Sequence, residues 1–140
     1  ECPGTNDQAR TTSNHPPTLA DTLVIFGCRY QAKDCLYGAE WKQWATTSHA
    51  NLTYVVAASR DQPEKVYVQH RIRENGARIW DILGPRRGIA YLCGTSGKMP
   101  EQVKQSIVDV FVEHGHMNVD QAVRYLSTLE TERRWQEECW

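Results

Sequence analysis

Three short apolar runs rich in β-branched residues set the strongest limit on the fold of this chain. They are TLVIFGC (22–28), LTYVVAA (52–58) and GIAYLCG (88–94). Continuous apolar runs of this length, without polar alternation, are typical of strands buried on both faces of a parallel sheet. We therefore expect three strands of a parallel sheet.

Apolar residues recur at helical spacing between and after these runs. The helix faces that we expect carry Leu36, Ala39 and Trp44; Val68 and Ile72; Ile79 and Leu83, beyond a break at Asn75-Gly76; Val103, Ile107 and Phe111; and Ala122, Tyr125, Leu126 and Leu129. The alternation of strands and helices predicts a doubly wound (Rossmann-like) α/β domain.

Local signals place some of the helix starts. Asp34 suits the N-cap of the first helix, and Pro100 suits the first turn of a later one. Asn118, with Gln121 three residues on, predicts a capping box. Residues 1–20 hold three of the six prolines and few apolar residues, so we expect a polar arm at 1–20 and one domain at 21–140.

Composition excludes several classes of function. The net charge is −1, so no global basic field would attract nucleic acid or an anionic membrane. No apolar run approaches the roughly 20 residues of a membrane span. The five cysteines are odd in number and lack CxxC spacing, which argues against a disulfide framework or a zinc site and favours reduced thiols in the cytoplasm.

Polar and small residues follow each expected strand. The second run ends in Ser59-Arg60, with Lys65 and Tyr67 close behind. In open parallel sheets, ligands bind beyond the carboxyl ends of the strands. A guanidinium, an ammonium, a hydroxyl and a phenol together suit a phosphorylated aromatic ligand such as a nucleotide. The alternative is a solvated loop with ordinary charges.

Four motifs, FGCR, SRDQPEKVYVQ, YLCGTSGKMP and the terminal ECW, stand in an order and spacing that resemble one family. They are similar to the NADPH-binding lobe of diflavin reductases, within the ferredoxin–NADP reductase-like group. The resemblance covers roughly residues 21–140. It implies NADP(H) as a ligand of this lobe, with FAD and FMN held by other domains of the same polypeptide.

The resemblance also implies roles for single residues. The residues implied to hold the 2′-phosphate and adenosine are Ser59, Arg60, Lys65, Val66, Tyr67, Val68 and Gln69. Arg29 would lie near the adenosine or pyrophosphate, and Cys93 beside the nicotinamide, with Gly94 allowing close approach. Glu138 falls where the family has an acidic residue near the hydride path, and Trp140 would cover the flavin ring. Cys28 and Cys35 are interpreted as structural.

The chain departs from the family pattern in three places. Thr95 follows Cys93-Gly94 where P450 reductases carry Asp, and Gln102 stands where close relatives carry a nucleotide-contacting Asp. The family's first strand and its Gly-rich pyrophosphate loop are expected to be missing, because only CPGTN (2–6) resembles the loop.

The resemblance implies a reductase that passes a hydride from NADPH to FAD and then single electrons through FMN to a protein acceptor. The KMP and RRWQEECW segments are most similar to members that reduce an iron–sulfur cluster assembly factor. Two alternatives stay open: a P450-reductase or sulfite-reductase relative with another acceptor, and a non-catalytic nucleotide-binding or interaction module.

Overall fold

The structure is a computed structural model that describes residues 20–47 and 51–140. The arm expected at 1–20, with its CPGTN segment, lies outside the described residues except for Ala20. The elements follow in the order β1 (Thr22–Cys28), α1 (Gln31–Asp34), α2 (Gly38–Thr46), β2 (Leu52–Ala58), α3 (Val68–Glu74), α4 (Gly76–Leu83), β3 (Ala90–Gly94), α5 (Lys98–Gly115), α6 (Val119–Thr131) and β4 (Trp135–Cys139).

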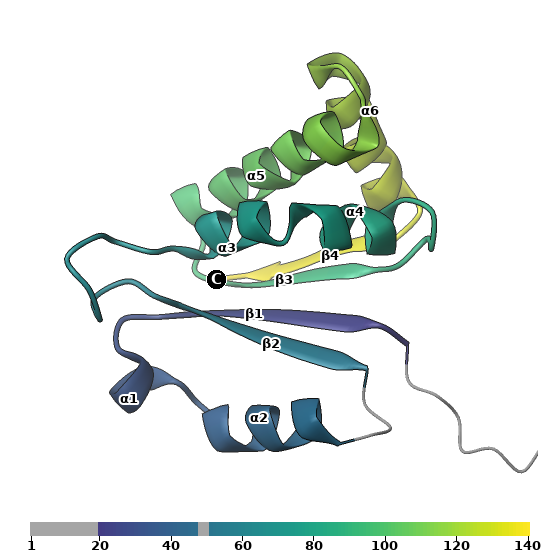
Figure 1. The fold of residues 1–140 in the computed structure, drawn as a ribbon. Coiled ribbons are helices and arrows are strands. Elements are labelled where there is room, and N and C mark those ends of the chain that lie inside the picture. Colours follow the sequence, from purple (N-terminus) through teal and green to yellow (C-terminus); the bar gives the residue numbers. More distant parts are fainter. Residues whose placement is uncertain (1–19, 48–50) are drawn as a thin grey trace, which may run out of the picture.

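The strands are parallel, as the apolar runs predict, but they form two sheets. β1 pairs with β2, from Thr22 opposite Leu52 to Cys28 opposite Ala58. β3 pairs with β4, from Ala90 opposite Trp135 to Gly94 opposite Cys139. Within the described part of the chain, no hydrogen-bonded ladder joins the two sheets, although Figure 1 draws β1 and β3 as their nearest strands.

Helices α3 to α6 form a layer beside the two sheets (Figure 1). α5 lies at its centre, with Val103, Ile107 and Phe111 buried as their spacing predicts. Leu23 and Ile25 of β1 pack against the same apolar cluster, and so do Ala90 and Leu92 of β3. The two sheets therefore share one core without sharing a ladder.

Burial of the strands is less complete than the apolar runs predict. β1 has no buried residue, and β2 has only Ala57 and Ala58. Both strands were expected to be covered on both faces. Among the described residues, β1 has a strand partner on one edge only. Its other edge therefore lacks the cover that a neighbouring strand would provide.

Two local predictions about helix starts have opposite outcomes. The Asn118 cap is confirmed: its side chain accepts from the Gln121 N–H at 2.9 Å, and the Gln121 side chain accepts from the Asn118 N–H at 3.0 Å. The Asp34 cap is wrong, because Asp34 ends α1 and its carboxylate accepts from the Tyr30 N–H at 2.9 Å. Leu36 consequently lies between α1 and α2 and is exposed.

Two boundaries also differ from expectation. β3 begins at Ala90 rather than at 88, because Arg87 has a positive φ of 54° and the Gly88 N–H turns back to the Ile82 carbonyl at 2.6 Å. β4 was not expected at all. Its sequence, WQEEC, contains three polar residues that resemble a helix end more than a strand.

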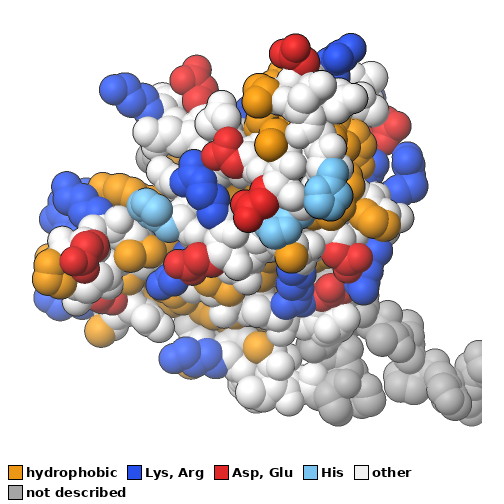
Figure 2. Space-filling view, turned by 45° about the horizontal axis from the view of Figure 1, so that its top comes forward, with side chains coloured by type: hydrophobic (Ala, Val, Ile, Leu, Met, Phe, Trp, Pro, Cys, Tyr) orange, Lys and Arg blue, Asp and Glu red, His pale blue; other side chains and the backbone are white. Residues whose placement is uncertain are grey.

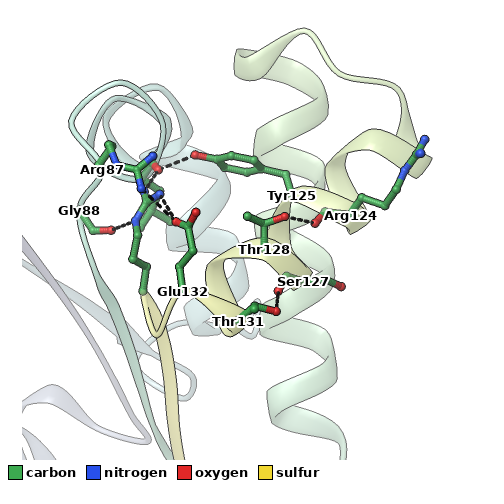
Figure 3. A network of polar contacts seen from close by, with 10 residues as sticks. Arg87, Gly88, Arg124, Tyr125, Ser127, Thr128, Thr131 and Glu132 are labelled. Atoms are coloured by element: carbon green, nitrogen blue, oxygen red, sulfur yellow. Dashed lines mark hydrogen bonds and ion pairs between the residues drawn. The ribbon is translucent and has the colours of Figure 1, made fainter.

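A buried arginine fixes the entry to β3 and β4. Arg134 donates to the carbonyls of Leu83 and Gly88 and pairs with Glu132 at 3.3 Å. The Tyr125 hydroxyl donates to the same Leu83 carbonyl at 2.9 Å, from across the turn shown in Figure 3. This network ties α4, α6 and the turn before β3 together, so the register of β3 against β4 is well determined.

Figure 2 shows acidic and basic side chains interspersed across the visible face. No helix in the described ranges is long and apolar enough to cross a membrane. The same ranges contain no cluster of His, Cys, Asp or Glu that would hold a metal ion.

Candidate functional site

The turns that follow β1 and β2 are held together by backbone hydrogen bonds. The Ser59 N–H donates to the Cys28 carbonyl at 2.9 Å, and the Arg60 N–H donates to the Arg29 carbonyl at 2.9 Å. The parallel ladder thus continues past the strand ends. Two segments that the sequence predicts to bind one ligand, around Arg29 and around Ser59–Arg60, therefore lie against each other.

The loop from Ser59 to Tyr67 is organised by Gln62. Its side-chain amide donates to the carbonyls of Ala58 and Glu64, both at 2.8 Å. Asp61 adds a link to the other turn, because its carboxylate accepts from the Gln31 N–H at 3.0 Å. Sequence reasoning missed both residues, although Asp and Gln beside a proline are a typical signal of a turn held by side chains.

An open depression of about 410 Å³ lies at these strand ends. Its lining residues are Gly27, Cys28, Arg29, Ala57, Ser59, Tyr67, Val68, Gln69, Met99 and Gln102. Six of these were predicted site residues: Arg29, Ser59, Tyr67, Val68, Gln69 and Gln102. The other three predicted residues of this group, Arg60, Lys65 and Val66, lie on the adjoining loop and not in the lining.

The cations around the depression are available to bind an anion. Arg29, Arg60 and Lys65 are all exposed. Within residues 20–47 and 51–140, none of the three forms an ion pair with a carboxylate. Six other arginines in the described ranges do form such a pair: Arg71, Arg73, Arg78, Arg86, Arg87 and Arg134. Unpaired guanidinium and ammonium groups beside a serine hydroxyl suit a phosphate.

Tyr67 provides an aromatic surface at the same place. Its side chain is 42% exposed although it adjoins the first turn of α3. Close by, the Gln69 amide donates to the Gln102 side chain at 3.2 Å, which joins α3 to α5 across the depression. An exposed ring next to unpaired cations suits a base that carries a phosphorylated sugar.

Gly27 permits this arrangement. A Cβ atom at this position would lie 2.9 Å from Cγ1 of Val68. The end of β1 can therefore approach the first turn of α3 closely only because residue 27 has no side chain. Sequence reasoning named the FGCR motif but assigned no role to this glycine.

Cys28 behaves as a neutral thiol in this site. Burial raises its pKa above the ordinary value, and electrostatic interactions with Cys35, Asp34 and Asp61 raise it further. Cys35 contacts the Tyr54 hydroxyl at 2.9 Å. Burial and this hydrogen bond also raise the pKa of Tyr54. Both groups are thus uncharged at neutral pH, in keeping with a packing role.

A second group of predicted residues gathers at the end of β3 and β4. Cys93 stands directly opposite Glu138 in the parallel pairing, and both residues are exposed. Opposed residues project from the same face of a sheet. The two predicted catalytic residues therefore lie on one open face.

Trp140 is attached to this strand end by its backbone alone. Its N–H donates to the Gly94 carbonyl at 3.1 Å, and its carbonyl accepts from the Ser96 N–H at 2.6 Å. Its side chain is 73% exposed. Trp140 is therefore not a core residue, and its ring is free to contact another surface.

Met99 connects the two groups. It lines the depression, and a Cβ atom at Gly94 would lie 2.6 Å from its Cε atom. Gly94 has a φ of +155°, which residues with a side chain rarely adopt. The depression and the Cys93 end of β3 are therefore neighbours. Sequence reasoning cited Met99 only as part of a motif.

The fold and the site together define a nucleotide-binding α/β domain, and comparison with known proteins specifies its class. Residues 8–105 match the family described as the oxidoreductase NAD-binding domain. The chain belongs to this family. Its parallel strands agree with such a domain, and so does the depression at the carboxyl ends of β1 and β2, where ligands of open α/β sheets bind.

Within this class, the relatives are named as NADPH-dependent diflavin oxidoreductases or NADPH–cytochrome P450 reductases. The chain is 38% identical to NADPH-dependent diflavin oxidoreductase 1 of Xenopus laevis, over 95% of this chain and 21% of that protein. It is 34% identical to the NADPH–cytochrome P450 reductase of Musca domestica, over 87% of this chain and 18% of that protein. The chain thus spans about a fifth of the length of these relatives.

The residues present fit the adenosine end of a phosphorylated dinucleotide. Arg29, the Ser59 hydroxyl and the exposed phenol of Tyr67 line one depression, and two further cations, Arg60 and Lys65, lie on the adjoining loop. This donor set would hold the extra phosphate that distinguishes NADP(H) from NAD(H).

Proposed function

We propose that this chain is the NADPH-binding lobe of a diflavin reductase. The observation that carries the proposal is the convergence of Arg29, Ser59 and Tyr67 on one depression, with Arg60 and Lys65 unpaired on the adjoining loop. The similarity to diflavin relatives supports it.

At the adenosine end, Ser59, Arg60 and Lys65 hold the 2′-phosphate. Tyr67 contacts the adenine with its ring. Val66, Val68 and Gln69 complete the adenosine contacts, and Gln102 acts through its hydrogen bond with Gln69. Arg29 lies toward the pyrophosphate.

At the nicotinamide end, Gly94 allows close approach and Cys93 lies beside the ring. Glu138 sits next to Cys93 and influences the hydride path. Trp140 covers the flavin until nicotinamide replaces it, which requires a side chain with the freedom that its exposure provides.

The flavins supply the redox chemistry: FAD accepts the hydride, and FMN passes single electrons onward. We place both in other domains of the full polypeptide, which works in the cytoplasm. The proposed acceptor is an iron–sulfur cluster assembly protein. A haem protein is the alternative, because P450 reductases are among the relatives.

The proposal also explains the divided sheet. β1 and β3 would flank the position of a further parallel strand, so that the two sheets are parts of one doubly wound sheet. We propose that this strand and its Gly-rich loop are the family features that the sequence analysis expects to be missing.

Replacement of Arg60 tests the coenzyme assignment. Arg60→Ala in a full-length reductase removes a charged hydrogen bond to the 2′-phosphate, worth roughly 1.5–3 kcal/mol, or about 10- to 150-fold in affinity. We expect kcat/KM to fall by that factor with NADPH and to stay nearly unchanged with NADH. Arg124→Ala, an exposed arginine on α6, is the matched control. Equal losses with both coenzymes would contradict the assignment.

A further inference from the structure

His70 ends the KVYVQH motif, yet the proposed NADPH contacts give it no role. It lies on the first turn of α3, three residues after Tyr67. The side-chain contacts described for it are with Tyr67, which faces the proposed ligand, and not with the ligand site directly. Its function, if it has one, is therefore exerted through that tyrosine.

His70 holds the backbone of Tyr67 from both sides. The Tyr67 N–H donates to Nδ1 of His70 at 2.8 Å, and the His70 N–H donates to the Tyr67 carbonyl at 3.0 Å. Tyr67 precedes the helix with an extended backbone, φ −109° and ψ 169°. Its N–H has no intrahelical partner in that position. The imidazole thus takes the place that Glu or Gln occupies in a capping box.

The same imidazole also supports the ring of Tyr67. The two rings stack with their centroids 5.9 Å apart and their planes 20° from parallel. Tyr67 nevertheless stays 42% exposed. One side chain therefore restrains both the backbone and the ring of Tyr67 and leaves part of that ring open to a ligand.

This geometry fixes the protonation pattern of His70. Because Nδ1 accepts a hydrogen bond from a backbone N–H, it carries no proton, and the proton of the neutral ring is on Nε2. An isosteric ring without an acceptor could keep the stacking but not the backbone bond. The two contributions can consequently be separated by substitution.

We propose that His70 is a positioning residue that holds Tyr67 ready to receive the adenosine 2′-phosphate end of NADPH. The inference rests on the proposed function. Without His70, the phenol and the turn before α3 sample other conformations, and the cost of ordering them falls on ligand binding. The loss should appear in affinity and KM rather than in kcat.

The test compares three variants of a full-length reductase that contains this lobe. His70→Gln keeps an acceptor for the Tyr67 N–H, His70→Phe keeps only a ring, and His70→Ala keeps neither. The probe is 2′,5′-ADP, titrated by calorimetry. We expect binding within about threefold of wild type for Gln, and weaker by about three- to tenfold for Phe and about tenfold or more for Ala. His116→Asn is the control. His116 lies at the C-terminal end of α5, so this change should leave binding unchanged.

A double-mutant cycle with Tyr67→Ala separates positioning from a general structural effect. If His70 acts through Tyr67, His70→Ala should weaken binding in the wild-type background and add little in the Tyr67→Ala background. Additive losses, or wild-type affinity in His70→Ala, would overturn the inference while the proposed function stands. A wild-type protein that binds 2′,5′-ADP no better than 5′-ADP would overturn both.

Discussion

Trp140 illustrates how much a single residue can decide. Its backbone closes the turn after β3, while its side chain is 73% exposed and is not part of the core. If the ring covers the flavin, it occupies the place that nicotinamide needs for hydride transfer. It would then oppose productive binding of NADPH and NADH alike.

We therefore expect Trp140→Ala, in a full-length reductase, to raise activity with NADH by a larger factor than activity with NADPH. NADH lacks the phosphate that helps NADPH displace the ring. Turnover with NADPH should slow where nicotinamide then lingers on the flavin and release becomes limiting. Steady-state rates with both coenzymes are the measurement.

A melting curve provides the control for this prediction. Truncation of a buried aromatic residue costs about 3–5 kcal/mol, whereas an exposed one should cost little. Trp44→Ala on α2, also an exposed tryptophan, is the matched variant and should change neither coenzyme preference nor stability greatly. A parallel fall in both activities of Trp140→Ala, together with a lower melting temperature, would rule out the lid.

At the scale of single elements, β4 depends on Glu137. Its carboxylate accepts from Trp135 Nε1 at 2.6 Å and pairs with Lys104 of α5 at 2.5 Å. Burial alone would raise the pKa of Glu137, but the hydrogen bonds from Lys104 and Trp135 and the charge of Lys104 hold it below the ordinary value. Burial alone would lower the pKa of Lys104, but its hydrogen bonds with Glu130 and Glu137 and the charges of these two carboxylates raise it.

A lowered folded-state pKa means that Glu137 stabilises the fold above its unfolded-state pKa and loses that effect as the pH falls through the folded value. We expect Glu137→Gln to cost about 1 kcal/mol at pH 7, or about 2–4 °C in melting temperature, and progressively less from about pH 5 to about pH 3. Glu138→Gln is the control, because among the described residues Glu137 forms the ion pair with Lys104 and Glu138 forms none. A Glu137→Gln deficit that stays constant over this pH range would contradict the prediction.

Elements with strong local signals were predictable from the sequence. Thr22–Cys28 and Leu52–Ala58 match the apolar runs, and Asn118 caps α6 as its spacing predicts. β4 was not predictable, because its stability comes from pairing with β3 and from Lys104, which are distant in sequence. The prediction of Asp34 as an N-cap was wrong, because Asp34 is the last residue of the short helix α1 and its carboxylate accepts from the Tyr30 N–H before that helix.

The site was predictable where a motif and a strand end coincide, as at Ser59 and Tyr67. Its supporting residues were not. Gln62, Met99 and His70 act through contacts with other site residues, and neither hydropathy nor charge marks such contacts in a sequence. The opposition of Cys93 and Glu138 likewise required the register of β4.

The molecule as a whole consists of two parallel sheets, the helices α3 to α6 on one side, and α1 and α2 beyond β2 (Figure 1). Among the described residues, β1 and β3 each have one edge without a strand partner. Free strand edges attract other strands and favour aggregation. We expect the 140-residue chain, expressed alone, to be poorly soluble or to elute as oligomers when size-exclusion chromatography is combined with light scattering.

A full-length reductase that carries the same lobe is the control and should elute as a defined species. A cooperative melting transition of a clean monomer of the short chain, with no additional strand in its experimental structure, would refute this prediction.

The alternation along β4 has a consequence for how sequences of this kind are compared. Glu137 and Glu138 are chemically identical neighbours, yet one binds Lys104 and the other stands opposite Cys93. Their different contacts follow from their odd or even position along the strand, which decides the face of the sheet on which each side chain lies, and not from their residue type. An alignment shifted by one position would still match a glutamate to a glutamate. It would, however, match the residue that binds Lys104 to the residue that lies opposite Cys93. An alignment of this strand therefore has to keep each residue at its odd or even position.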